Sequence, residues 1–231
     1  LRYKAVLRGP DGSRLAATPG LERRGRGGIS PRVLRVTFRS DDSFPGHLRG
    51  LFNVPNVFGS AGAGRTHQAE LYQGADCADV IVAAAREAGA RIAYTSVLGF
   101  RRHAEPVTGK LLLRADGIYA LERGLVPRKV ALRFGSEIRS GDIMLIDYVG
   151  FNGSPRTWDH IAVVDRDGGT RGQFDPEDPV LHMGYLYGLT EVPARTGRPA
   201  IVRFLRIKPR VRRAMRRHRR RLSRRRRAPR G

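Results

Sequence analysis

Apolar residues recur at helical spacing in one segment of the chain, residues 77–88. Counted from the first apolar residue, the others follow at positions +3, +4, +7, +8 and +11. These residues are Cys77, Val80, Ile81, Ala84, Ala85 and Ala88. This spacing places them on one face of a helix. Asp76 precedes the segment as a candidate N-cap, Asp79 lies in the first turn, and Gly89 suits the position after the last turn. The pattern therefore predicts an amphipathic helix with Cys77 in its first turn.

The second half of the chain changes to short apolar runs separated by turn-rich loops. The runs that we predict to be strands are residues 143–149, 161–165, 180–185 and 200–207. The stretch 109–123 is instead predicted to form helical turns. One helix followed by a series of strands is typical of an α+β fold with an antiparallel sheet, rather than of alternating β-α-β units.

Composition divides the chain into three expected parts. Two short strand-like runs, at residues 3–8 and 33–39, flank a linker at 19–31 that is rich in Gly, Arg and Pro. The expected parts are the N-terminal strands and linker at 1–45, one folded domain at 46–207, and a basic tail at 208–231.

Much of the positive charge lies at one end of the chain. The 231 residues carry a formal net charge of +23, and residues 208–231 contain 14 basic residues, no acidic residue and few apolar ones. Such a segment cannot bury a core of its own, so we expect a disordered tail. Two interpretations stay open: a solvated, self-repelling tail, or an arm that binds a polyanion such as nucleic acid, anionic lipid or an acidic cell-wall polymer.

Cysteine and histidine usage excludes several classes of site. Cys77 is the only cysteine, which excludes an intramolecular disulfide and a cysteine-rich zinc or iron–sulfur site. His47, His67 and His103 lack metal-ligand spacing and, like the acidic loop at 165–178, are expected to face solvent. We expect no metal and no organic cofactor. The longest nearly uncharged apolar run is far shorter than the ~18 residues of a membrane span, so no transmembrane segment is expected.

The cysteine lies where a nucleophile would be favoured. Unpaired backbone N–H groups and the helix dipole stabilise an anion at a helix N-terminus, so they lower the pKa of a thiol there. A thiolate nucleophile needs a base or ion-pair partner, which a third polar group orients. His160 begins one predicted strand and His182 lies in the next, so both can meet on one face of an antiparallel sheet. Asp76, Asp159 and Trp158 adjoin these residues in the sequence and are candidate substrate-binding or orienting groups.

An interpretation without chemistry is also open for the same residues. A cysteine on the apolar face of a helix is often a small core residue, and a histidine near a strand end is often only hydrogen-bonded. The order of Cys, His and a second polar residue favours the site, but none of these residues alone does.

Several segments resemble the NlpC-type papain-like cysteine peptidases. They are Val54-Pro-Asn-Val-Phe-Gly-Ser60, Gly74-Ala-Asp-Cys-Ala-Asp-Val80, Gly141-Asp-Ile-Met-Leu145 and His160-Ile-Ala-Val-Val164. The resemblance covers about residues 50–190. It implies a papain-like core with an N-terminal catalytic helix packed on an antiparallel sheet. It also implies a peptidase or amidase that cleaves peptidoglycan or a related peptide, and hence a location in the cell envelope or outside the cell.

The resemblance also implies roles for individual residues. Cys77 would be the nucleophile, His160 the base and His182 the residue that orients it, with an acyl-enzyme as intermediate. The backbone N–H of Cys77 would be an oxyanion donor. Asn56 stands where the family usually has Tyr, and Ala78-Asp79 replaces Ser-Gly after the cysteine, so the substrate is expected to differ. The same residues would also serve acyl transfer.

A glycine-rich loop offers a third function class, nucleotide binding. Gly59-Ser-Ala-Gly-Ala-Gly-Arg-Thr66 differs from a phosphate-binding P-loop by Arg65 in place of Lys, which is not a conservative exchange. Gly74 also interrupts the long helix that should follow. The two leading hypotheses are therefore a thiol hydrolase and a non-catalytic polyanion-binding protein, with a P-loop protein as the lesser alternative.

Overall fold

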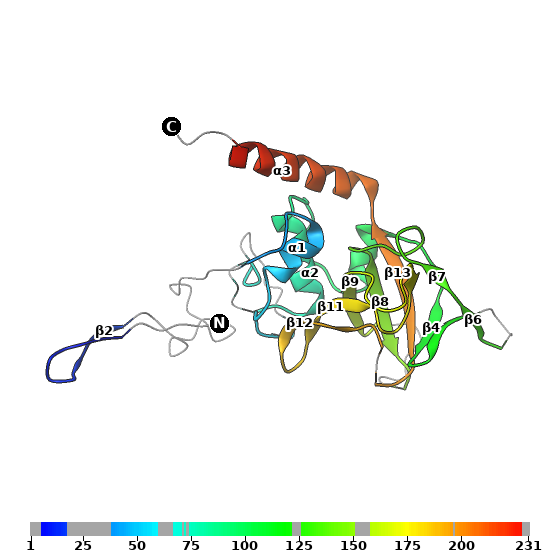
Figure 1. Ribbon diagram of the computed structural model, residues 1–231, viewed down its shortest axis with the longest axis horizontal. Helices are drawn as coiled ribbons and strands as arrows, with labels where there is room; N and C mark the ends of the chain where they lie inside the picture. The colour runs from blue at the N-terminus through cyan, green and yellow to red at the C-terminus, as the bar shows by residue number, and fades with distance from the viewer. Residues whose placement is uncertain are drawn as a thin grey trace.

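The fold combines a large antiparallel sheet with few helices (Figure 1). The computed structural model describes residues 6–17, 38–59, 67–70, 72, 74–121, 126–150, 158–195 and 197–227. Helices α1 (Phe44–Arg49) and α2 (Cys77–Glu87) lie against the sheet, a short 3₁₀-helix η1 (Gly99–Arg102) follows them, and α3 (Pro209–Arg227) crosses one end of the molecule. The predicted combination of helices with an antiparallel sheet is confirmed.

Within the described residues, nine strands form the main sheet. Their spatial order is β12-β11-β9-β8-β13-β4-β5-β6, and β3 also pairs with β13. The strands are β3 (Ala104–Pro106), β4 (Leu111–Arg114), β5 (Gly117–Ala120), β6 (Arg128–Val130), β8 (Ile143–Tyr148), β9 (His160–Val164), β11 (Pro179–Gly184), β12 (Gly188–Pro193) and β13 (Ala200–Ile207). Two separate pairs are β1 (Val6–Arg8) with β2 (Arg14–Ala17), and β7 (Leu132–Arg133) with β10 (Gln173–Phe174).

The central strands bury side chains on both faces, which explains their continuous apolar runs. On β8, Ile143 and Leu145 belong to the core under the helices, whereas Met144 and Ile146 belong to a second core on the opposite face. Helices α1 and α2 cover the first face, and residues of β4, β5, β7 and β10 cover the second. Since α2 contacts β9 and β11, its first turn lies close to the strands that carry His160 and His182.

The predicted helix and four predicted strands are confirmed. Helix α2 begins at Cys77 as expected, with Asp76 as its N-cap, and it ends at Glu87 with Gly89 in the left-handed region at φ +96°. The runs at 143–149, 161–165, 180–185 and 200–207 correspond to β8, β9, β11 and β13. Strand β12 was not predicted.

The predicted helical turns at 109–123 are wrong, because this stretch contains the β4–β5 hairpin. Its leucine-rich start favours a helix locally. Pairing of Leu111 with Val202 of β13, and of Arg114 with Gly117 across the tight turn, makes it part of the sheet instead. Contacts with a strand far along the chain override the local preference here.

The C-terminal segment is also different from its prediction, because residues 209–227 form helix α3 rather than a disordered tail. Val211 is buried, and Met215 packs against the core under the helices. His218 meets Gly89 so closely that a Cβ at Gly89 would overlap the histidine side chain. The segment has too few apolar residues to fold alone, but contact with the body supplies the burial that it lacks.

The N-terminal part is described only in places. The predicted strand at 3–8 agrees with β1, whereas the linker at 19–31 and residues 33–37 lie outside the described residues. Phe38 and Arg39 are not in a strand. Helix α1 starts just ahead of the expected domain boundary at residue 46, and Phe44 belongs to the core. None of the described helices has the length and apolar character needed to cross a lipid bilayer.

Candidate functional site

Cys77 is the first residue of α2 and is partly buried against the core. The Asp76 carboxylate caps the helix by accepting hydrogen bonds from the backbone N–H groups of Ala78 (3.0 Å) and Asp79 (2.8 Å). An N-cap of this kind stabilises a helix start by about 1 kcal/mol. Asp76 therefore holds the turn that carries the thiol.

The structure brings His160 and His182 into direct contact. In the sheet register His182 of β11 lies opposite Ala162 of β9, so it is a diagonal neighbour of His160 on the same face. Nε2 of His160 lies 2.9 Å from Nδ1 of His182, with the rings nearly perpendicular at 88°. One of these two nitrogens donates a proton and the other accepts it, so the contact fixes the orientation of the His160 ring.

Burial keeps both imidazoles neutral. It lowers the pKa of His160 to about 3, and the neighbouring His182 adds to the effect because two cations would repel. Burial lowers the pKa of His182 as well. A neutral imidazole can accept a proton, so near pH 7 His160 is in the form required of a general base.

The thiol of Cys77 is also neutral, which corrects the prediction of a lowered pKa. Burial raises its pKa to about 11, and the Asp76 carboxylate raises it further by repelling a thiolate. The backbone N–H groups of Ala78, Ile161 and Cys77 itself act in the opposite direction but do not prevail. Helix-terminal amides do lower a thiol pKa, as the sequence argument assumed, but desolvation outweighs them at this site.

The same backbone contact places Cys77 beside the start of β9. Its sulfur adjoins the amide of Ile161, the residue that follows His160. Across the described residues, no hydrogen bond joins the sulfur to the His160 ring. The structure thus brings His160 into contact with His182 and places the Cys77 thiol beside the start of the strand that carries His160. The thiol and the two imidazoles are all uncharged.

Tyr148 also belongs to this group, although no pattern in the sequence identified it as a site residue. It is the last residue of β8, and its ring stacks on His160 at a centroid distance of 6.4 Å. Burial raises the pKa of Tyr148, and Asp159 and Cys77 contribute in the same direction, so the phenol lies within the field of the thiol. The pairing of Ile146 with His160 puts Tyr148 on the diagonal position. Only knowledge of this register would have identified it.

Asp159 and Trp158 flank the site without contacting the histidine pair in a described hydrogen bond. A carboxylate oxygen of Asp159 accepts a hydrogen bond from the backbone N–H of Tyr148 at 2.9 Å. Trp158 packs against the core under the helices, with the ammonium of Lys110 5.6 Å from its ring centroid. Asp159 thus holds the end of β8, and Trp158 forms part of the wall beside it.

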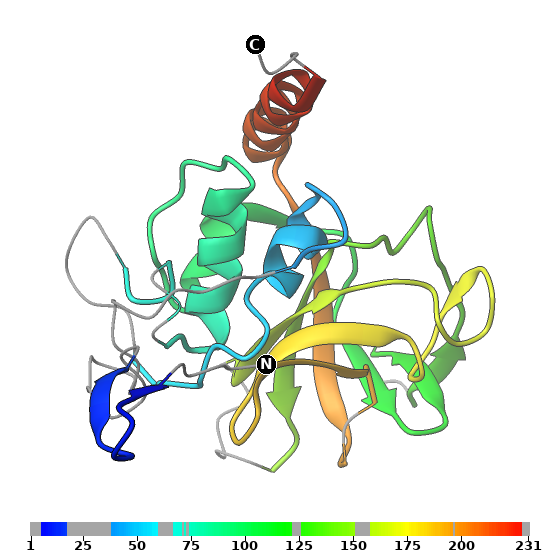
Figure 2. The same ribbon diagram turned by 60° about the vertical axis from the view of Figure 1, so that its left-hand side comes forward.

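A cavity of about 340 Å³ opens at the tip of the β11–β12 hairpin, at the end of the strand that carries His182. It is lined by Asn53, Pro55, Asn56, Tyr185, Leu186, Tyr187 and Gly188. Asn56 connects the cavity to the site, because its backbone bridges Ala75 and its side-chain amide donates to the carbonyl oxygen of Gly184 at 3.3 Å. Figure 2 shows this hairpin beyond one end of α2 and α3 beyond the other.

The expectation of solvent exposure holds for Asp167 and Glu177 but is wrong for two other histidines and two acids of the 165–178 loop. His47 and His67 are buried, with His67 stacked on Tyr94 at a centroid distance of 3.7 Å. Asp165 is buried beside Arg49, and Asp178 accepts hydrogen bonds from several loop amides. Asp178 thus organises its own loop, whereas Asp165 is held by a contact with a residue far away in the sequence.

The remaining motifs give no second chemical centre among the described residues. Residues 60–66 of the glycine-rich loop lie outside them, so the P-loop alternative is not tested. In the described part of the chain, no group of three or more His, Cys, Asp or Glu is arranged to hold a metal ion. Comparisons with family models, with curated proteins and with solved structures give no match for this chain.

Proposed function

We propose that the protein is a thiol hydrolase that cleaves an amide or peptide bond through an acyl-enzyme on Cys77. The observation that carries the proposal is the 2.9 Å contact between His160 and His182, on strands that adjoin the thiol-bearing end of α2. The two buried, neutral histidines lie on strands next to the helix that carries the only cysteine, and a neutral imidazole is the kind of base that a thiol nucleophile needs. The core that we propose is papain-like, with a helix that begins at the nucleophile packed on an antiparallel sheet.

The electrostatics determine how the reaction would start. Because the pKa of Cys77 is raised and that of His160 is lowered, the thiol gives up its proton as its sulfur attacks the carbonyl carbon. Nε2 of His160 is engaged with His182, so Nδ1 receives the proton. In this mechanism Nε2 of His160 carries the proton and donates it to Nδ1 of His182, which leaves Nδ1 of His160 as the acceptor.

The remaining steps reuse the same groups. The proton on His160 passes to the leaving nitrogen as the carbon–nitrogen bond breaks, which releases the amine and leaves a thioester on Cys77. His160 then takes a proton from water as the water oxygen attacks the thioester, and the proton returns to the sulfur as the carbon–sulfur bond breaks. The backbone N–H of Cys77, at the start of α2, is our candidate for stabilising the oxyanion.

The cavity at the β11–β12 tip supports a polymeric substrate. Tyr185, Leu186 and Tyr187 are consecutive and largely exposed, which is unusual for side chains of this size. Aromatic faces and apolar surface at the mouth of a site suit an extended glycopeptide, so we propose the peptide part of peptidoglycan as the substrate class. Asn56, in place of the usual Tyr, would donate its hydrogen bonds at the inner end of this cavity.

The test uses two substrates, p-nitrophenyl acetate and soluble peptidoglycan fragments. With the activated ester we expect a burst of nitrophenol and an acetyl group on Cys77, detected by mass spectrometry of the intact chain. Cys77→Ala should abolish both, and His160→Gln should slow the burst by about 10²–10⁴-fold, the usual loss for a general base. His103→Gln serves as the matched control, because His103 is a half-buried histidine next to η1 rather than on β9.

Two results would contradict the proposal. One is a burst rate that is equal in the wild-type chain and in His160→Gln; the other is acetylation at lysines rather than at Cys77. Release of new amino termini from peptidoglycan fragments would identify the bond that is cleaved, and its loss in Cys77→Ala would assign it to this site.

A second candidate function, polyanion binding, rests on the order of α3. Arg213, Arg217 and Arg220 are exposed and recur at helical spacing on the side of α3 away from the body. A helix that presents one row of arginines outward suits the regularly spaced phosphates or sulfates of a polyanion. This function would add to the thiol site rather than replace it.

A further inference from the structure

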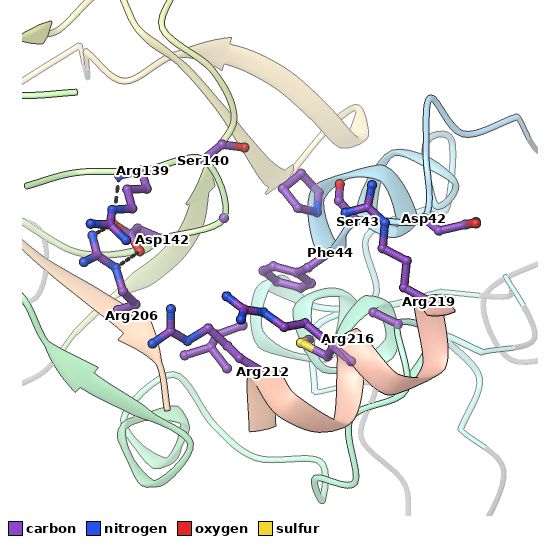
Figure 3. Close-up of a pocket in the computed structure, with 15 residues that line it drawn as sticks. Asp42, Ser43, Phe44, Arg139, Ser140, Asp142, Arg206, Arg212, Arg216 and Arg219 are labelled. Carbon is purple, nitrogen blue, oxygen red and sulfur yellow. Dashed lines mark hydrogen bonds and ion pairs between the residues drawn. The ribbon is translucent and has the colours of Figure 1, made fainter. Parts of the chain in front are cut away.

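A cavity of about 290 Å³ lies at the opposite end of α2 from Cys77. It is enclosed by the first turns of α3, by the start of α1, by the turn before β8 and by the end of β13 (Figure 3). Ala88, just after α2, reaches its wall. With 11 residues rising about 1.5 Å each, α2 separates this cavity from the thiol by roughly 16 Å. The cavity is therefore a separate site.

The wall of this cavity carries an excess of arginines. They are Arg139, Arg206, Arg212, Arg216 and Arg219. Arg206 is neutralised by Asp142, with guanidinium-to-carboxylate distances of 2.9 and 2.6 Å. The other wall carboxylate, Asp42, lies 2.6 Å from Arg39. Among the described residues, no ion pair is formed by the four remaining arginines.

Arg212 contributes a buried polar atom to this cavity. Its Nε is buried and has no hydrogen-bond partner within the described structure. Buried polar atoms are nearly always hydrogen-bonded, and a charged group without a partner costs still more free energy. Val211 and Met215, which pack on the body, hold Arg212 in this place. An anion in the cavity would supply the missing acceptor.

The four arginines other than Arg206 come from two sides of the cavity, α3 and the turn before β8. Arg212, Arg216 and Arg219 lie at helical spacing along one flank of α3, where Arg212 is half-buried and the other two are exposed. Figure 3 shows Arg216 extending toward Phe44 and Arg212 extending toward the side of the cavity that holds Arg206. Arg139 approaches from the turn before β8. Planar guanidinium forks from two sides match the oxygens of a phosphate, and several of them suit a dianion better than a single carboxylate.

The cavity also has an apolar side. Phe44, Pro45, Ile207 and Met215 line it beside the arginines. A volume of about 290 Å³ is at the lower limit of ligand pockets, which hold a compact molecule rather than a polymer. Gly141, at φ +86°, brings the turn before β8 against Phe44 and Pro45 and so completes the enclosure.

We propose that this cavity binds a phosphate monoester, with its phosphate between Arg139, Arg212 and Arg216 and its organic part against Phe44 and Met215. The ligand could be a soluble phosphate ester or the headgroup of an anionic phospholipid such as phosphatidic acid, since both present the same chemistry. Its binding would fix α3 against the body, because Arg212 and Arg216 belong to α3, whereas Phe44 belongs to α1 and Arg139 to the turn before β8.

The test measures calorimetric binding of phenyl phosphate to the full chain at 0.15 M salt. We expect one saturable site and a weaker affinity for inorganic phosphate, which lacks the ring. Arg212→Gln with Arg216→Gln should weaken binding at least about tenfold, the usual loss for a charged hydrogen bond. The matched control, Arg213→Gln with Arg217→Gln, removes the same charge from the outer side of α3 and should change the affinity less than about twofold.

Further arms separate a site from general charge attraction. Arg139→Gln should weaken the binding of phenyl phosphate about as much as the Arg212→Gln, Arg216→Gln double variant. Because Arg139 lies outside α3, this variant tests the proposal even if the double variant loosens the helix. Flotation with phosphatidic acid vesicles, compared with phosphatidylcholine vesicles, distinguishes a lipid headgroup from a soluble ester. The proposal is overturned if the inner and outer double variants lose affinity equally, or if duplex DNA binds while phenyl phosphate shows no saturation.

Discussion

At the scale of single residues, Cys77 and His160 show how burial acts on acids and bases in opposite directions. Burial disfavours the charged form of each group, so it raises the pKa of the thiol to about 11 and lowers that of the imidazole to about 3. The resting pair is uncharged near pH 7. A thiol in this state is protected from indiscriminate alkylation, yet it can still react with a carbonyl when His160 accepts its proton.

This arrangement predicts the pH dependence of Cys77 alkylation. Iodoacetamide reacts with thiolate formed in advance, and a raised pKa means that the protonated form prevails until the pH approaches about 11. At pH 8 we expect labelling of the folded protein to be more than about tenfold slower than labelling of the unfolded chain, whose thiol has a pKa near 8.5.

The measurement is the rate of mass increase against pH, with and without urea, and Cys77 as the only cysteine makes it unambiguous. Rapid labelling of the folded protein near pH 6, abolished by His160→Gln, would instead show a stored thiolate–imidazolium pair and would contradict the neutral pair.

At the scale of elements, α2 connects the two sites that we propose. Its first turn carries Cys77, and the residues after its last turn meet both the arginine-lined cavity and α3. Gly89 makes this second contact possible in two ways. Its φ of +96° is unfavourable for other residues, and the absence of a Cβ admits His218.

We therefore predict that Gly89→Ala releases α3 from the body. Backbone strain and overlap with His218 should lower the free energy of unfolding by roughly 1–3 kcal/mol. Hydrogen-exchange mass spectrometry should show faster exchange across residues 209–223, whereas the sheet keeps its protection. Gly135→Ala is the matched control, because Gly135 has φ +89° but nothing within contact distance of a new Cβ. Equal exchange of α3 in the two variants would refute the docking role of Gly89.

At the scale of the whole molecule, the arginine-rich helix α3 and the thiol lie at opposite ends of α2. Helix α3 lies across the end of the molecule beyond the last turn of α2, and the β11–β12 hairpin lies near its first turn. A polyanion bound along the outer arginines of α3 would therefore leave the cavity beside Cys77 accessible. Such a tether would concentrate the protein on an acidic polymer while the thiol site stays open.

If α3 binds polyanions, substitution of its outer arginines should weaken the salt dependence of polyanion binding more than substitution of arginines elsewhere. In fluorescence titrations with heparin or DNA, log K should fall linearly with log salt, without sequence preference. Replacing Arg213, Arg217 and Arg220 by Gln should reduce the slope by up to about 3, close to one unit for each lost contact. Replacing Arg128, Arg133 and Arg171, which are exposed on other elements, removes the same net charge and should have a much smaller effect. Equal effects of both triple variants would mean that α3 has no special role.

The sequence by itself determined the features that depend on neighbouring residues. The extent of α2, its Asp76 cap, Gly89 after its end and four of the sheet strands follow from periodicity and from capping preferences within a few positions. The pairing of His160 with His182 was also anticipated, because the two predicted strands follow one another in the sequence and consecutive strands are often neighbours in a sheet.

Only the tertiary structure decided the properties that depend on distant contacts. Tyr148 joins the site through the β8–β9 register, and Arg139 lines the same cavity as Arg212 although more than 70 residues separate them in the sequence. The raised pKa of Cys77 and the order of α3 have the same origin, since both result from burial against elements that are remote in sequence. Periodicity reports which face of an element is apolar, whereas desolvation depends on what covers that face, and only the assembled fold supplies the cover.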